Sequence, residues 1–178
     1  MSSDILGIDA LPPALTQDVN LNSIPLTMLD GSAANFDNFK GKVVLIVNVA
    51  SRCGLSPQYA ALEELHKKYS SRGFTVLGVP SNQFLQELGT SEAISEYCST
   101  TWGVTFPMTE KVAVNGRKRH PLYKELVKAK DSAGLGGAVK WNFEKFLVLP
   151  NGEVHRFRPT TKPDDVEIVS LIEANLPG

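Results

Sequence analysis

Cys53 is the residue of this sequence whose surroundings best fit chemical reactivity. It follows Val43–Val49, a β-branched and aliphatic run typical of a central strand buried on both faces. It precedes Tyr59–Tyr69, whose apolar residues form one stripe of a helix. A helix presents free N–H groups and the positive end of its dipole to such a turn, and both favour the thiolate, the nucleophilic form. We therefore interpret Cys53 as a reactive thiol rather than as a buried structural cysteine, which is the common alternative.

Other residue types that carry chemistry are poorly placed. His66, His120 and His155 fall on a predicted helix, turn and strand, without metal-ligand spacing. His120 precedes a proline and is better explained as a helix-cap neighbour than as a catalytic base. No glycine-rich loop follows a strand in phosphate-binding spacing. The basic run Arg117–Arg119 is interpreted as a solvated turn rather than a nucleic-acid patch, although it could help to dock an acidic reductant.

The composition limits the functions that are open to the chain. Its 178 residues fit one domain, with residues 1–18 expected to form an N-terminal extension and residues 19–178 the domain itself. A net charge of −1 gives no reason to expect nucleic acid or an anionic membrane as partner. No run of about 18 apolar residues is present, and the N-terminus does not resemble a secretory signal. Two cysteines without paired spacing make neither a disulfide framework nor a zinc cluster, so a reducing cytoplasmic location is expected.

The order of the predicted elements indicates an α/β fold with a central sheet flanked by helices. An Asp30-Gly31 turn predicts a small N-terminal hairpin before the Val43–Val49 strand. After Tyr59–Tyr69, further strands are predicted at Phe74–Val79, Lys145–Leu149 and Val154–Arg158, and helices at about Thr90–Thr100, Pro121–Lys130 and Pro163–Asn175. This order is that of a thioredoxin-like domain with an N-terminal β-hairpin and an insertion.

Three segments make a more specific resemblance. Asn48-Val-Ala-Ser-Arg-Cys-Gly54 resembles the active-site signature of the glutathione peroxidase family, and Pro80-Ser-Asn-Gln-Phe84 resembles its Pro-Cys-Asn-Gln-Phe signature. Trp141-Asn142-Phe143 is similar to its Trp-Asn-Phe segment. The motifs occur in the family's order over roughly residues 20–176 and look most like the bacterial cysteine-containing members.

The resemblance implies which residues take part in catalysis. Cys53 matches the peroxidatic residue, which is selenocysteine in many animal members, and Trp141 and Asn142 match two further members of the catalytic tetrad. Gln86 matches the catalytic Gln of the family's Gln-Glu-Pro-Gly segment, although this chain has Leu88 in place of the Pro and is one residue shorter just before Gln86. Taken without the motifs, Trp141 would be interpreted as a core aromatic and the two amides as loop caps.

These residue types suit peroxide reduction without a cofactor or a bound metal. A thiolate attacks the O–O bond, and the leaving oxygen must acquire a proton. The indole and amide N–H groups of Trp141, Asn142 and Gln86 stay neutral across the working pH range and can stabilise the charge that develops. None of them is a general base near neutral pH, so proton delivery is assigned to water or a relay. Cys53 would become a sulfenic acid, which is the first reversible oxidation product of cysteine.

The resemblance leaves two routes for reducing Cys53 again. In many cysteine-type members a second cysteine condenses with the sulfenic acid, and thioredoxin reduces the disulfide. Cys98 is the candidate here, but it falls one residue before the usual position, and one residue turns a helical side chain by about 100°. A disulfide also needs Cα atoms within about 7 Å, so the predicted helix would have to unwind locally. Glutathione or another small thiol is the alternative donor.

The short loop Ser132–Gly137 matches the monomeric branch of the family, so we expect a monomer whose open site accepts bulky as well as small hydroperoxides. Two other classes remain as hypotheses. A thioredoxin-like disulfide reductase would need Cys-x-x-Cys, but position 56 is Ser. A thioredoxin-fold binding or metal-delivery protein would need a metal site, for which the sequence offers no second and third ligand.

Overall fold

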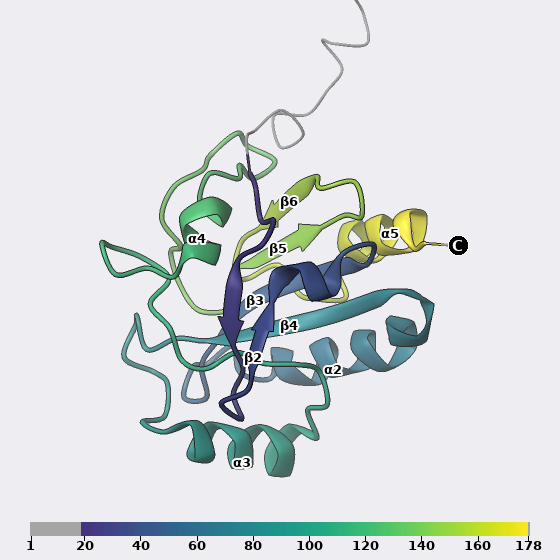
Figure 1. The fold of residues 1–178 in the computed structure, drawn as a ribbon. Helices are drawn as coiled ribbons and strands as arrows, with labels where there is room; N and C mark the ends of the chain where they lie inside the picture. The colour runs from purple at the N-terminus through teal and green to yellow at the C-terminus, as the bar shows by residue number, and fades with distance from the viewer. Residues whose placement is uncertain (1–18, 178) are drawn as a thin grey trace, which may run out of the picture.

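A four-stranded mixed sheet in the order β4-β3-β5-β6 forms the centre of the computed structural model, which describes residues 19–177 (Figure 1). β3 (Val43–Val49) pairs in parallel with β4 (Phe74–Pro80) and antiparallel with β5 (Lys145–Val148), and β5 pairs antiparallel with β6 (Val154–Phe157). Every residue of β3 and β4 is buried, as their apolar runs predicted. The expected N-terminal extension, residues 1–18, lies outside the described residues.

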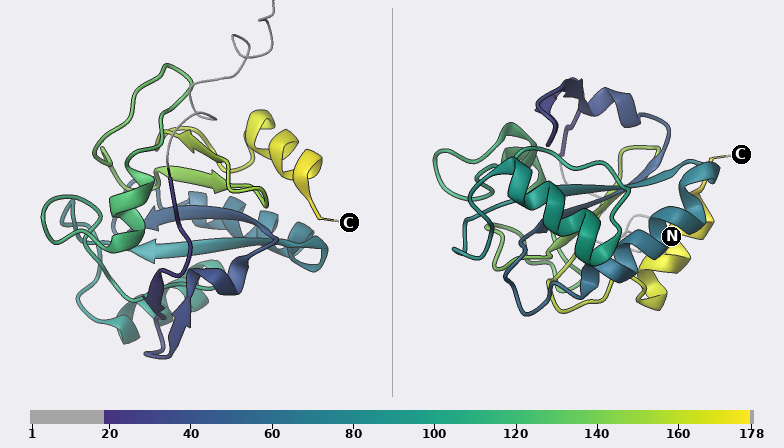
Figure 2. Two further views of the ribbon diagram at one scale, coloured as in Figure 1. Left: turned by 45° about the horizontal axis from the view of Figure 1, so that its top comes forward. Right: turned by 90° about the horizontal axis from the view of Figure 1, so that it is seen from below.

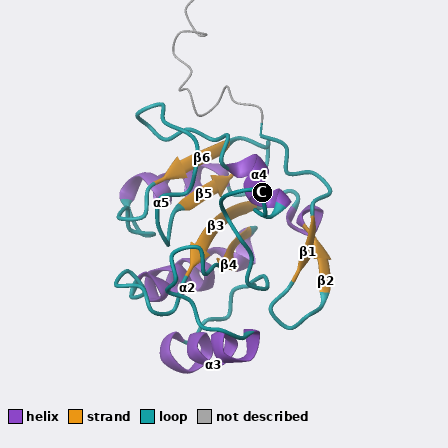
Figure 3. Cartoon of the chain, turned by 90° about the vertical axis from the view of Figure 1, so that its left-hand side faces the viewer, coloured by secondary structure: helices purple, strands orange, loops and turns teal. Residues whose placement is uncertain are grey.

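Helices cover one face of the sheet, and a hairpin with a short helix covers the other (Figures 2 and 3). Alternate side chains of β3 enter two apolar cores, one with Val43, Leu45 and Val47 and the other with Val44 and Ile46. The first core is closed by α2 (Gln58–Tyr69), α3 (Ser91–Trp102) and α5 (Val166–Asn175). The second is closed by β1 (Pro25–Thr27), β2 (Ala33–Asn35), the 3-10 turn η2 (Phe36–Phe39) and α4 (Pro121–Leu126). The predicted thioredoxin-like arrangement with an N-terminal hairpin is therefore confirmed.

Local side chains set where the helices begin. The Thr90 hydroxyl accepts the Ala93 N–H at 3.1 Å, which caps α3 as expected. His120 caps α4, because its Nδ1 accepts the Leu122 N–H at 3.0 Å and Pro121 occupies the first turn. His120 is thus a capping residue, as the sequence suggested. After α2, the 3-10 turn η3 (Ser70–Arg72) ends at Gly73 in the left-handed region, with φ 91°.

Two helix boundaries were predicted wrongly. α4 ends at Leu126 rather than Lys130, because the N–H groups of Lys128 and Ala129 donate to the residues three back, Glu125 O at 3.1 Å and Leu126 O at 2.9 Å, instead of four back. The chain beyond is held by Gly137 and Arg156, which donate to Val127 O and Ala129 O at 2.9 Å each. α5 begins at Val166 rather than Pro163, because Asp165 is its N-cap and its carboxylate accepts the Glu167 N–H at 2.9 Å.

The basic run of the sequence lies at the surface of the protein. Arg117 and Lys118 lie in an exposed turn, which supports the interpretation of the basic run as solvated. Within residues 19–177, no helix has the length and apolar character needed to cross a membrane.

Candidate active site

Cys53 lies in the turn between the carboxyl end of β3 and the first residues of α2. The Leu55 N–H points at its sulfur, with 3.3 Å between the nitrogen and Sγ, and the Ser56 N–H donates to the Cys53 carbonyl at 2.9 Å. Cys53 is only 4% exposed.

The loop after β4 is fastened to the Cys53 turn by a series of hydrogen bonds. The Ser81 N–H donates to Val49 O at 3.1 Å, and the Arg52 N–H donates to Gln86 O at 2.8 Å. A third bond runs from the Ser51 N–H to the carboxylate of Glu87 at 3.0 Å. These bonds hold Gln86 beside the turn that carries Cys53.

A buried amide in β3, Asn48, brings in the third segment. Its Nδ2 donates to Trp141 O at 3.1 Å, and its Oδ1 accepts the Glu144 N–H at 3.1 Å. Its own carbonyl accepts the Phe143 N–H at 2.6 Å. Phe143 adopts φ 66°, a backbone conformation that a residue with a bulky side chain rarely takes. The hydrogen bonds from Asn48 therefore hold this segment in a strained conformation.

The segment places Asn142 against Gln86. The Asn142 amide is fully buried, and its Nδ2 donates to Gln86 Oε1 at 3.2 Å. Because this bond uses the side-chain oxygen of Gln86, the hydrogens on its Nε2 remain available as donors. Asn142 Oδ1 is buried without a hydrogen-bond partner in the described structure.

Trp141 lies at the rim of the site. Its side chain is 38% exposed and packs on the Phe84 ring, with the ring centroids 5.0 Å apart. It is therefore not a core aromatic, which was the alternative interpretation from sequence. Leu85, which is 84% exposed with φ 61°, adds a second large apolar side chain next to Gln86.

Gln83, the other glutamine of this loop, serves the fold. Its Oε1 accepts the N–H groups of Val114 and Asn115 at 3.2 and 3.1 Å.

The structure therefore brings together Cys53, Gln86 and Asn142 by direct bonds or adjacent backbone, and places Trp141 next to Asn142.

Cys98 is in a different environment. It is 2% exposed in an unbroken α3, and burial raises the pKa of its thiol to about 11. It faces Tyr59 in the first core, as the one-residue shift in its motif suggested. Both cysteines are free thiols. In this conformation Cys98 is not ready to attack a sulfenic acid, since the attacking species is the thiolate.

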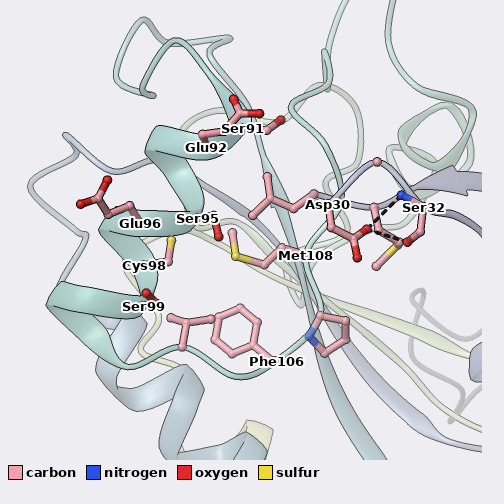
Figure 4. Close-up of a pocket in the computed structure, with 15 residues that line it drawn as sticks. Asp30, Ser32, Ser91, Glu92, Ser95, Glu96, Cys98, Ser99, Phe106 and Met108 are labelled. Atoms are coloured by element: carbon pink, nitrogen blue, oxygen red, sulfur yellow. Dashed lines mark hydrogen bonds between the residues drawn. The ribbon is translucent and has the colours of Figure 1, made fainter.

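A cavity of about 970 Å³ lies between α3 and the turn of the β1–β2 hairpin (Figure 4). Cys98, Phe106 and Met108 line its apolar part, and Asp30 and Glu92 lie at its edge. Cys53 is not among its lining residues. A smaller cavity of about 390 Å³ borders the Cys53 turn and is lined mainly by residues of that turn, the first turns of α2 and the segment before α5: Gly54, Leu55, Pro57, Gln58, Ala61, Thr160, Lys162, Pro163 and Asp164.

Sequence reasoning assigned no role to Asn48 and Glu87. Asn48 carried a usable signal, because it is the one polar side chain inside the apolar strand Val43–Val49. Glu87 matches the Glu of the resembling Gln-Glu-Pro-Gly segment, but nothing in the sequence separates a buried carboxylate from the common solvated one.

Comparison with known proteins agrees with this geometry. The family described as glutathione peroxidase matches residues 21–127. Glutathione peroxidase-like peroxiredoxin 2 of Saccharomyces cerevisiae is 54% identical over 80% of this chain and 90% of its own length. Thioredoxin/glutathione peroxidase BtuE of Escherichia coli is 47% identical over 83% of this chain and 92% of its own. The hydroperoxy fatty acid reductase gpx1 of Synechocystis is 51% identical over 78% of this chain and 86% of its own.

Solved structures give the same result. The chain is similar to the structure titled Trgpx in apo form, with a TM-score of 0.68 and 36% identity over 90% of this chain and 100% of that one. It is also similar to GPX1 of T. cruzi, with a TM-score of 0.66 and 32% identity over 84% of this chain and 94% of that one. A thiol:disulfide interchange protein from Chlorobium tepidum, at 20% identity and a TM-score of 0.58, shares the fold.

Proposed function

Because the chain belongs to the glutathione peroxidase family and is a thiol peroxidase, we propose that it reduces hydroperoxides through Cys53, with Gln86, Trp141 and Asn142 as the surrounding donors. The observation that carries this assignment is the 3.2 Å hydrogen bond from Asn142 to Gln86, made beside the turn that holds Cys53. Two amides that serve only as loop caps would have no reason to meet at the carboxyl end of the central strand.

The proposed first step forms one bond and breaks one. The Cys53 thiolate attacks an oxygen of the peroxide, the S–O bond forms and the O–O bond breaks. The second oxygen leaves with the electron pair of that bond and takes a proton as water or an alcohol. N–H groups of Gln86, Asn142 and Trp141 stabilise the charge on the leaving oxygen, and the proton comes from water or a relay. Cys53 is left as the sulfenic acid, oxidised by two electrons.

Two thiols then return Cys53 to its starting state. The first thiol displaces water and forms a disulfide with Cys53, and the second releases the Cys53 thiol by exchange. The first thiol is either Cys98, after which thioredoxin reduces the internal disulfide, or glutathione. The Cys98 route requires the part of α3 that buries this thiol to open, because Cys98 is 2% exposed within an unbroken helix. The related E. coli enzyme is named for both donors.

The substrate class follows from the rim of the site. Trp141 and Leu85 place exposed apolar surface next to Gln86, which suits an organic hydroperoxide as well as hydrogen peroxide. The related Synechocystis protein is named as a hydroperoxy fatty acid reductase. We propose that this chain is a monomer, as its short Ser132–Gly137 loop suggests, and that it acts in the cytoplasm, since its two cysteines lack the paired spacing of a disulfide framework.

Coupled NADPH oxidation tests these assignments. Peroxide turnover is followed with thioredoxin and its reductase, and separately with glutathione and its reductase, on the wild type, Cys53→Ser and Cys98→Ser. We expect Cys53→Ser to lose turnover with both donors, and retained turnover in that variant would overturn the assignment of Cys53. Loss of only the thioredoxin-driven rate in Cys98→Ser would establish the internal disulfide, and unchanged rates would assign reduction to the external thiol. No turnover by the wild type with either donor would reject the proposed function.

A further inference from the structure

Glu87 is a buried carboxylate that directly follows Gln86 in the loop after β4. It is 6% exposed, and its Oε1 accepts two backbone N–H groups, from Ser51 at 3.0 Å and from Leu88 at 2.8 Å. Its Oε2 is buried without a hydrogen-bond partner in the described structure. Burying a carboxylate is costly, so the two N–H groups are the main compensation that this position offers.

The two partners connect the parts that the chemistry needs. Ser51 lies two residues before Cys53, and Glu87 directly follows Gln86. The Arg52 N–H donates to Gln86 O at 2.8 Å, so two consecutive residues of the Cys53 turn bond to two consecutive residues of the Gln86 turn. One of these bonds is between main-chain atoms, and the other depends wholly on the Glu87 side chain.

We propose that Glu87 is a positioning residue for peroxide reduction, whose carboxylate fastens the Gln86 turn to the Cys53 turn. This inference rests on the proposed role of Gln86 as a donor to the peroxide. Glu87 itself does not touch the reacting atoms. It fixes the distance between the Gln86 amide and the Cys53 sulfur, and small errors in such distances are costly in rate.

The residue after Glu87 contributes to this arrangement. Leu88 stands where the resembling segment has proline, which has no N–H. Its amide supplies the second bond to Glu87, while Lys111 Nζ donates to the carbonyls of Leu88 and Gly89 at 3.2 and 3.1 Å. The Glu87 carboxylate and the Lys111 ammonium group therefore both bond to the backbone of the turn that carries Gln86.

The ionised form of Glu87 makes these bonds best, because a carboxylate accepts N–H groups more strongly than a neutral acid does. Ser51, Tyr59, Cys98 and Lys111 are the polar and titratable groups around it. Burial raises the pKa of Glu87, against the hydrogen bonds from Ser51 and Leu88 and the charge of Lys111, which lower it. Protonation of Glu87 as the pH is lowered should therefore loosen the Gln86 turn, and Glu87→Gln should reproduce that loosened state at every pH.

The test is a double-mutant cycle on kcat/KM for hydrogen peroxide, with Glu87→Gln, Gln86→Ala and the double variant. We expect Glu87→Gln to lower kcat/KM about tenfold at pH 8 and to cause little further loss in the Gln86→Ala background. The ratio of wild-type to Glu87→Gln activity should fall towards one as the pH is lowered. Glu96→Gln, which changes an exposed carboxylate on α3, is the control and should keep wild-type activity.

Two results would reject the role of Glu87. One is a Glu87→Gln loss that adds in full to the Gln86→Ala loss, and the other is an activity ratio that does not change with pH. Failure of the proposed function looks different, since the wild type itself would then reduce no peroxide.

Discussion

The amide of Asn142 donates to Gln86 Oε1 at 3.2 Å across a sequence separation of 56 residues. Each residue therefore orients the other, and we expect Asn142→Ala and Gln86→Ala each to lower kcat/KM about 100-fold, the cost typical of losing one preorganised donor. The double variant should lose much less than the product of the two. Steady-state peroxide reduction measures all three. Fully multiplicative losses would show that the two amides act independently.

Asn48 should matter for both stability and activity. Asn48→Ala leaves Trp141 O and the Glu144 N–H without their partner inside the protein, and each unmet buried group costs about 1–3 kcal/mol. We expect the free energy of unfolding in urea to fall by about 3 kcal/mol and kcat/KM to fall with it. Asn175→Ala removes a half-buried amide bond at the end of α5 and is the control, with a smaller loss of stability and unchanged activity. Equal effects of the two substitutions would contradict this role for Asn48.

The buried Lys145 should make the free energy of unfolding depend on pH. Its Nζ donates to Phe143 O at 2.6 Å and Pro159 O at 3.0 Å, and burial lowers its pKa to about 7, although the charge of Glu144 opposes the shift. The unfolded lysine titrates near 10.4, so between about pH 7 and pH 10 the unfolded chain binds the additional proton. The free energy of unfolding should therefore rise with pH in this window, by up to about 1.4 kcal/mol per pH unit.

The difference between wild type and Lys145→Met isolates this contribution. Urea unfolding at pH 7, 8 and 9, with reductant present, should show wild-type stability increasing relative to the variant. A difference that stays constant with pH would mean that Lys145 keeps its proton in the folded protein.

Arg156 should be a main support of the loop after α4. Its side chain is fully buried, forms an ion pair with Glu144, and donates to Ala129 O at 2.9 Å and Ala138 O at 3.1 Å. Arg156→Met removes one of the two ion pairs of the buried Glu144 and leaves the carbonyls of Ala129 and Ala138 without their donor, so it should cost about 3–5 kcal/mol of unfolding free energy. Arg158→Met is the matched comparison, since Arg158 is 25% exposed and pairs with the same glutamate. Its loss should be clearly smaller, and the opposite order would contradict the prediction.

The elements that depend on local sequence were predictable. β3, β4 and α2 follow from apolar periodicity alone, and the cap of α3 follows from Thr90. The end of α4 did not follow, because the chain beyond it is held by Arg156 of another strand, which donates to Ala129 O from 27 residues further along the chain. Local propensity contains no information about such a partner.

The sequence predicted which residues form the site, but not which hydrogen bonds connect them. Cys53 could be recognised from its strand–turn–helix position, and Gln86, Trp141 and Asn142 from motif resemblance. The sequence did not indicate that Asn142 bonds to Gln86, that Asn48 holds the Trp141 segment, or that Glu87 is buried against Ser51. Each of these depends on segments that meet only in the folded sheet, and the rim position of Trp141 depends on the same packing.

The pairing of β3 with β5 has a consequence for the order in which the protein matures. Asn48 reaches Trp141 and Glu144 across 93 and 96 residues, while Cys53 and its turn belong to the contiguous β3–α2–β4 unit. Loop closure over so many residues is slow compared with local pairing. During synthesis Cys53 and Gln86 are made long before Trp141 and Asn142, and Cys53 acquires its full surroundings only when β5 is added to the sheet.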